Sequence, residues 1–178
     1  MRALSTAWSF HRISELELPV CRYCHELSSP RIQKFFSVIS RVGDGHYWYL
    51  ILAGLFVFQG QAALPAFKHI IVIGLICHLL YKSLKNTTAR IRPFDFAQDG
   101  FQTLVAPLDK YSFPSGHTLH AVVFTLTLTH YFPALAWVLV PFTLCVAASR
   151  VVLGLHYPTD VLAGALLGFA LTFASFLV

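Results

Sequence analysis

Long apolar runs alternate with polar stretches from residue 47 to the end of the chain, and the longest polar stretch precedes residue 114. A membrane-spanning helix needs about 20 consecutive, mainly apolar residues. Four runs come close to that length and predict spans over about 67–84, 114–132, 134–153 and 160–178. A fifth run, over 47–58, is too short alone, so we extend that span back toward Phe35. The pattern therefore predicts an all-α, polytopic transmembrane helical bundle of about five spans.

The N-terminal stretch, residues 1–35, mixes apolar and charged positions and contains no run long enough to cross a membrane. We expect one or two short amphipathic helices at the membrane surface here, with breaks at Pro19 and Pro30. The chain would then consist of an amphipathic interfacial tail, 1–35, and a transmembrane domain, 36–178. Residues 1–10 lack the apolar core of a secretory signal peptide, so we expect the first span to direct insertion.

Two pairs of residues inside the predicted spans indicate local contacts. Arg41 and Asp44 lie three residues apart near one end of the first span, where they can pair or extend toward the headgroups. Gly164 and Gly168 lie four residues apart in the last span. This spacing of small residues favours close contact between helices.

Composition supports a membrane protein and excludes several other classes. The 178 residues are 56% hydrophobic and 12% charged, against about 45–50% and about 25% in soluble domains. This balance excludes disorder, collagen and coiled coil, and the spans leave no room for a second globular domain. The net charge of +5 comes without a basic patch interleaved with aromatic residues, so we expect lipid and not nucleic acid as partner.

Polar residues collect at four ends of the predicted spans. If the spans alternate in direction, the end of the second, the start of the third, the end of the fourth and the start of the fifth share one membrane face. Ionisable residues inside membrane segments usually mark a functional site. The residues at these ends are Lys85, Arg92, Ser115, Gly116, His117, Ser149, Arg150, His156 and Asp160.

The residue types at these ends fit phosphate chemistry. Free backbone N–H groups at a helix start bind anions, and the P-S-G-H segment at 114–117 opens a helix. Arg150 offers a planar fork for phosphate oxygens, and two further cations end the second span. His156 and Asp160 are four apart, so the carboxylate can hold one imidazole nitrogen while the other acts as a nucleophile. No pair of carboxylates stands ready for a metal ion, so we expect phosphoryl transfer without a metal or other cofactor.

These residues form three motifs that resemble those of the PAP2 (type 2 phosphatidic acid phosphatase) family. The motifs are K-x6-R-P at 85–93, P-S-G-H at 114–117 and S-R-x5-H-x3-D at 149–160, complete and in order. The resemblance implies an integral-membrane phosphatase that acts on a lipid phosphate or diphosphate. The resemblance to short bacterial members suggests four candidate substrates: undecaprenyl pyrophosphate, phosphatidylglycerophosphate, phosphatidic acid and lipid A. Larger members have six spans, which leaves the role of the tail open.

The resemblance also implies a role for each motif residue. His156 would be the nucleophile that forms a phosphohistidine, and Asp160 would orient it. His117 would protonate the leaving oxygen and then activate water. The phosphate would be bound by Lys85, Arg92, Arg150, the Ser115 hydroxyl and the Gly116 amide.

Two other functions fit part of the sequence. A non-catalytic membrane subunit that binds lipid headgroups would need the cations, but it would not need His117, His156 and a carboxylate partner. The C-x-x-C-H segment at 21–25 matches a c-type haem attachment pattern. Such a short pattern recurs by chance, so free thiols are the more ordinary expectation, with a tail disulfide or a zinc site as alternatives.

Two arguments about orientation in the membrane disagree. All 13 Lys and Arg residues except Lys68 fall on the face that carries the motifs, and the positive-inside rule would place that face in the cytoplasm. The family resemblance places it outside. We expect a multi-pass protein of the bacterial inner membrane with its site toward the periplasm or exterior. The sequence leaves the oligomeric state open.

Overall fold

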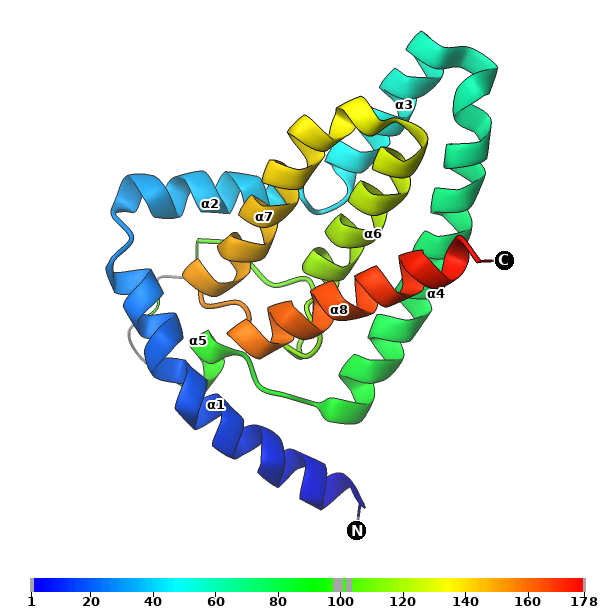
Figure 1. Cartoon of the computed structure of the whole chain (residues 1–178). Helices are drawn as coiled ribbons and strands as arrows, with labels where there is room; N and C mark the ends of the chain where they lie inside the picture. Colours follow the sequence, from blue (N-terminus) through cyan, green and yellow to red (C-terminus); the bar gives the residue numbers. More distant parts are fainter. Residues whose placement is uncertain (1, 98–100, 102–103, 178) are drawn as a thin grey trace.

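In the computed structural model, residues 2–97, 101 and 104–177 are described, and every regular element among them is a helix (Figure 1). This confirms the all-α prediction for that part of the chain. The elements are α1 (Arg2–Glu26), α2 (Pro30–Val42), α3 (His46–Gln59), the short 3₁₀ helix η1 (Gly60–Ala63), α4 (Leu64–Thr88), α5 (Pro93–Phe96), α6 (Gly116–Tyr131), the 3₁₀ helix η2 (Pro133–Leu135), α7 (Ala136–Val152) and α8 (Pro158–Ser175).

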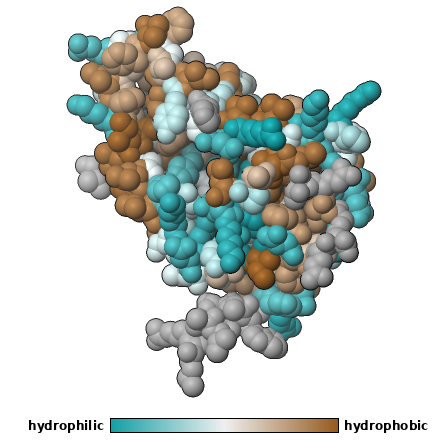
Figure 2. Space-filling view, turned by 180° about the vertical axis from the view of Figure 1, so that it is seen from behind, coloured by the Kyte–Doolittle hydropathy of each residue, from teal (hydrophilic) through white to brown (hydrophobic). Residues whose placement is uncertain are grey.

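Three segments of the described chain are long and apolar enough to cross a membrane: Tyr47–Phe96, Pro133–Val152 and Pro158–Ser175. The first of these contains both α3 and α4, which η1 joins by a turn (Figure 1). Large apolar side chains lie on the outer surface of these segments, with Phe58 85% and Trp137 87% exposed. Figure 2 shows apolar residues over the projecting end of the molecule and hydrophilic residues gathered nearer its middle. The structure therefore has a membrane-protein surface, while the count of five spans stays a prediction.

Helix α6 lies in the middle of the bundle and packs against α4, α7 and α8 (Figure 1). Its closest neighbour is α8, because two glycines of α8 face its backbone. A Cβ atom added at Gly164 would lie 2.5 Å from the Ser115 carbonyl oxygen, and one at Gly168 would lie 2.9 Å from that of Leu119. The close helix contact expected from this spacing is confirmed, and it fixes the start of α6 against the start of α8.

The N-terminal half corrects two sequence predictions. Helix α1 continues through Pro19, although Pro30 does begin a new helix with Ser29 as its N-cap. Contacts of α1 with α4, α5 and α7 offset the hydrogen bond that Pro19 removes. The single span extended back toward Phe35 is also wrong. Helix α2 ends at Val42, and the chain turns before α3 at Gly45, whose φ of 116° suits glycine.

Of the two possibilities for Arg41 and Asp44, pairing or extension toward the headgroups, the ion pair does not form. The Arg41 guanidinium donates to the Leu104 carbonyl oxygen at 3.2 Å. Asp44 lies in the turn between α2 and α3, and its carboxylate contacts His117 at the start of α6. The turn therefore supplies a carboxylate to the predicted site instead of an ion pair to the surface.

Candidate active site

The four helix ends identified in the sequence meet in one buried cluster. Lys85 lies in the last turn of α4, Arg92 precedes α5, and Ser115 is the N-cap of α6. The structure also places all the remaining predicted residues here: Gly116 and His117 in the first turn of α6, Arg150 in the last turn of α7, His156 in the α7–α8 connection and Asp160 in the first turn of α8. Their roles stay predictions.

His156 is 1% exposed and lies among the cations. Its Nε2 atom is 3.2 Å from Arg92 Nη1. Because a guanidinium can only donate, Nε2 accepts this hydrogen bond and carries a lone pair. Burial lowers the pKa of His156 well below its ordinary value, and the positive charges of Arg92 and Arg150 lower it further. The imidazole is therefore neutral near pH 7, with its proton on Nδ1 and its nucleophilic lone pair on Nε2.

Asp160 faces His156 but does not hydrogen bond to it. The two side chains approach to 3.6 Å, between Asp160 Oδ2 and His156 Nδ1. The same Oδ2 atom accepts the backbone N–H of Tyr157 at 2.9 Å, and Oδ1 accepts Arg90 Nη1 at 2.7 Å. The carboxylate is thus held in place by other groups, within electrostatic reach of the imidazole.

The three cations are buried, and most of their partners are neutral. Lys85 Nζ donates to the Tyr111 carbonyl at 2.9 Å and to Asp109 Oδ2 at 3.1 Å. Arg92 donates to the carbonyl oxygens of Leu155 at 2.7 Å and of Asp109 at 3.0 Å.

Arg150 donates to the Ser40 hydroxyl through Nη1, while its buried Nε atom has no partner among the described residues. A buried cation whose hydrogen-bond partners are mostly neutral keeps its positive charge uncompensated. The three cations should therefore attract an anion strongly.

The start of α6 adds an N-terminus to the cluster. Ser115 is fully buried, and its hydroxyl accepts the Thr118 N–H, so it caps the helix. Its own N–H donates to the Asp160 carbonyl oxygen at 3.0 Å. The predicted phosphate contact of this hydroxyl would therefore compete with capping, whereas the N–H groups of the first turn favour a nearby anion.

Sequence reasoning missed three charged residues at this site: Asp44, Asp109 and Arg90. Asp44 contacts His117, Asp109 contacts Lys85, and Arg90 contacts Asp160. Only Arg90 carried a sequence signal, since it lies two residues before Arg92 inside a motif. The other two come from turns and loops whose position depends on the fold.

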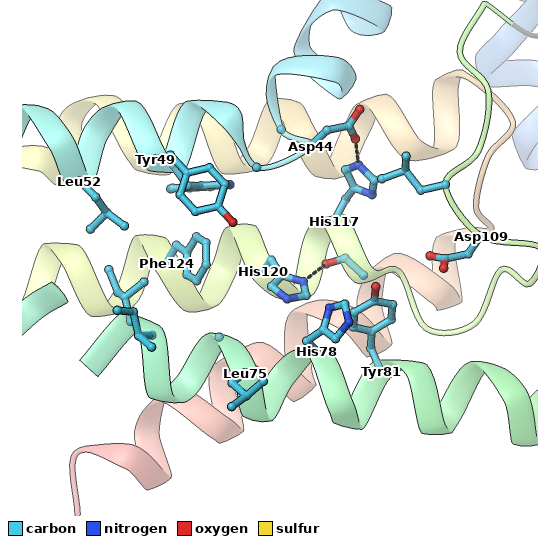
Figure 3. Close-up of a pocket in the computed structure, with 18 of the residues that line it drawn as sticks. Asp44, Tyr49, Leu52, Leu75, His78, Tyr81, Asp109, His117, His120 and Phe124 are labelled. Carbon is cyan, nitrogen blue, oxygen red and sulfur yellow. Dashed lines mark hydrogen bonds and ion pairs between the residues drawn. The ribbon is translucent and has the colours of Figure 1, made fainter. Parts of the chain in front are cut away.

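A cavity of about 600 Å³ opens beside the cluster, between α3, α4 and α6 (Figure 3). Its polar end contains His117 with Asp44, and also Asp109. His78, Tyr81 and His120 follow, with their rings edge to face at centroid distances of 5.2 and 5.4 Å. The far end is apolar and is lined by Leu52, Ile70, Leu75 and Phe124. One cavity thus joins a charged end to an apolar end.

Among the described residues, no three His, Cys, Asp or Glu side chains lie close enough together to hold a metal ion.

The chain is similar to membrane lipid phosphatases in sequence and in structure. The PAP2 superfamily pattern matches residues 62–178. The undecaprenyl-diphosphatase of Sulfolobus acidocaldarius is 32% identical over 138 residues, which cover 77% of this chain and 66% of that protein. The lipid A 1-phosphatase of Rhizobium etli is 24% identical, over 77% of this chain and 67% of that protein. The chain spans about two thirds of the length of these curated relatives.

Two solved structures share the fold. The transmembrane PAP2-type phosphatidylglycerolphosphate phosphatase from Bacillus subtilis superposes with a TM-score of 0.73 at 25% identity, covering 98% of this chain and 90% of that one. Aquifex aeolicus LpxE gives a TM-score of 0.69 at 25% identity, covering 92% and 96%. The family pattern covers most of this chain, the helical fold is shared, and the three motifs lie at one buried site. The chain therefore belongs to the PAP2 superfamily.

Proposed function

We propose that this protein hydrolyses a lipid phosphate or diphosphate through a phosphohistidine at His156. The observation that carries the proposal is the buried imidazole of His156, which lies among cations and accepts a hydrogen bond from Arg92 on Nε2. Burial and these cations lower its pKa, which favours the neutral form. A neutral imidazole is the nucleophilic form, and the cations stabilise the negative charge of the transferred phosphoryl group.

In the first step, Arg92 gives up its hydrogen bond to His156 Nε2 for one to a phosphoryl oxygen, Nε2 attacks phosphorus, and the bond from phosphorus to the leaving oxygen breaks. Protonated His117 gives its proton to that oxygen, so the lipid alcohol or lipid phosphate leaves. The Asp44 carboxylate beside His117 stabilises the charged imidazole before the transfer. Asp160, 3.6 Å from Nδ1 of the nucleophile, stabilises the positive charge that His156 gains.

In the second step, His117 takes a proton from water, and the oxygen attacks the phosphohistidine. The bond between phosphorus and Nε2 breaks, which releases inorganic phosphate and restores neutral His156. The three cations and the first turn of α6 hold the phosphoryl oxygens in both steps, so these side chains supply the charge stabilisation that a metal ion provides in other phosphoryl-transfer sites.

The cavity supports a lipid as the substrate. Its charged end lies at His117, where the scissile phosphate would be bound, and its apolar end can hold the adjoining part of the lipid chain. The named activities of the relatives concern undecaprenyl diphosphate, lipid A and phosphatidylglycerolphosphate. We propose the same class here, which includes phosphatidic acid.

A headgroup-binding subunit without activity is the second candidate. Binding needs only the cations, whereas this site also places a carboxylate beside each of two histidines. Asp44 contacts His117, and Asp160 lies 3.6 Å from His156. We therefore favour catalysis.

The test is phosphate release by the purified protein from a panel of these four lipid classes in detergent micelles. We expect release from at least one class, with His156→Ala at background. His130→Ala, in the last turn of α6 and exposed, serves as the matched control and should keep wild-type turnover. Substantial turnover by His156→Ala would show that the nucleophile is another residue.

We also propose that the protein lies in the bacterial inner membrane with this site toward the periplasm or exterior. The proposed lipids are available on that side of the membrane, although the distribution of Lys and Arg favours the opposite orientation. A fluorescent reporter that folds only in the cytoplasm, fused at the C-terminus, should be bright. A dark fusion, together with an active exported phosphatase fused at the same place, would reverse the orientation.

A further inference from the structure

Arg90 is buried in the centre of a polar network and is not available to a phosphate. Its side chain is 1% exposed and uses all three nitrogens. Nη1 donates to Asp160 Oδ1 at 2.7 Å and to Thr159 at 2.8 Å, and Nε donates to the Ser14 hydroxyl at 3.1 Å. Nη2 donates to Glu17 Oε2 at 2.7 Å. Arg90 therefore connects the first turn of α8 to α1.

Glu17 of α1 binds α8 directly as well. Its Oε1 atom accepts the Thr159 backbone N–H at 2.8 Å, and Oε2 accepts the Thr159 hydroxyl at 2.6 Å. Thr159 lies in the first turn of α8, where backbone N–H groups have no partner within the helix. A carboxylate at this place satisfies one of them and interacts favourably with the helix dipole.

The network determines the state of Asp160, which is 0% exposed. A buried carboxylate without a cation would take up a proton and lose its charge. Arg90 favours the ionised form of Asp160 against this effect of burial, and Glu17 holds the guanidinium from its other side. The ring of Tyr157 lies over the guanidinium at 4.0 Å and closes the network toward His156.

Other residues of α1 contact the backbone at the end of α7 and in the connection, 153–157, that follows it. Cys21 Sγ donates to the His156 carbonyl oxygen at 3.9 Å, and His25 Nδ1 donates to the Val152 carbonyl at 2.9 Å. Burial and the nearby Glu17 carboxylate raise the pKa of Cys21 to about 12, so it stays a thiol. The C-x-x-C-H segment thus packs α1 onto the backbone that carries His156.

From these contacts we propose that α1 is part of the active site: Glu17 and Arg90 are positioning residues that hold Asp160, and through it His156, in the attacking geometry. The proposal rests on the proposed function and assigns the N-terminal tail a role in turnover. Neither residue touches the reacting atoms. Both should therefore act on kcat more than on KM.

The experiment compares Glu17→Gln and Arg90→Lys with Glu15→Gln, a control on the same helix whose side chain is 57% exposed. We expect kcat to fall about 10- to 100-fold in the first two, because a misplacement of about 1 Å costs about 100-fold. KM should change little, and the control should match wild type. The unfolding temperature should fall in Arg90→Lys, which loses buried hydrogen bonds, and should fall less in Glu17→Gln, which keeps a neutral partner for Arg90. In the double variant, Glu17→Gln should lower kcat by a smaller factor than it does in the wild-type background, since both residues act through Asp160.

Two outcomes would overturn the proposal. One is a wild-type kcat for Glu17→Gln, and the other is a loss of kcat that only follows a loss of thermal stability. Orthovanadate binding, measured by calorimetry on the same proteins, tests the geometry without turnover. Weaker binding by Glu17→Gln than by Glu15→Gln supports the proposal even if wild type releases no phosphate from any lipid, whereas equal binding contradicts it.

Discussion

Gly164→Ala should show whether the position of the α6 N-terminus determines kcat independently of the stability of the fold. The added Cβ atom would lie 2.5 Å from the Ser115 carbonyl oxygen, where ordinary contacts begin at 3.4 Å. The obstacle is backbone, so α8 and the start of α6 must move apart by about 0.9 Å. Ser115 is the N-cap of the helix that carries Gly116 and His117. A shift of about 1 Å costs about 100-fold in rate, so we expect kcat to fall about 10- to 100-fold.

Stability should fall as well, and its magnitude follows from two opposed terms. Overpacking costs about 1–3 kcal/mol, whereas Ala is favoured over Gly in a helix by about 1 kcal/mol. The net loss for Gly164→Ala should therefore be about 0–2 kcal/mol. Gly168→Ala meets the Leu119 carbonyl oxygen at 2.9 Å, a shortfall of about 0.5 Å and one turn further from the site. It should lose stability with kcat within about threefold of wild type.

The assay measures kcat for phosphate release beside the thermal unfolding temperature in one detergent. Gly54→Ala is the control, since a Cβ atom there meets nothing within 4 Å, and it should keep kcat and gain up to about 1 kcal/mol. Wild-type kcat in Gly164→Ala would refute the placement of the α6 N-terminus in the catalytic geometry. Equal losses of kcat in Gly164→Ala and Gly168→Ala would show that both act through stability alone.

Four further predictions concern the chemistry of the site. His117→Ala should abolish turnover of lipid substrates but lower turnover less with a p-nitrophenyl phosphate ester, whose leaving oxygen needs no proton. Equal losses of turnover with both substrates would exclude His117 as the general acid. Activity should survive EDTA and be inhibited by orthovanadate; loss on chelation that Mg²⁺ restores would contradict the mechanism. Asp109→Asn should lower KM up to about fivefold at constant kcat, because the Asp109 carboxylate, 3.1 Å from Lys85 Nζ, competes with phosphate for that cation. A higher KM would mean that Asp109 positions Lys85 for the phosphate. A maleimide should label Cys24 faster than Cys21, whose pKa of about 12 and burial protect it, and faster labelling of Cys21 would contradict the packing of α1.

Local patterns in the sequence predict α4, α6, α7 and α8 and the face on which their polar ends meet, but they miss the continuous α1 and the turn between α2 and α3. Four helix ends with polar residues meet because the helices alternate, and Gly164 was correctly expected at a close helix contact. The same reasoning paired Asp44 with Arg41, because it considered neighbours along one helix. The turn at Gly45 instead points Asp44 at a helix more than 70 residues away in the chain. Partner choice for a polar side chain depends on tertiary packing, which no local spacing encodes. Pro19 failed for the same reason, because packing of α1 outweighs its helix-breaking tendency.

Arg90 and Arg92 illustrate how partner chemistry divides two residues that the sequence presents alike. Both are 2% exposed and lie two residues apart in the same motif. Arg90 has two carboxylate partners, Glu17 and Asp160, so its charge is fully compensated and is not available to a phosphate. Arg92 donates to two backbone carbonyls and to the neutral His156, and no carboxylate among the described residues forms a salt bridge with it. Its positive charge is therefore left for an incoming phosphate, beside the nitrogen that we propose attacks it.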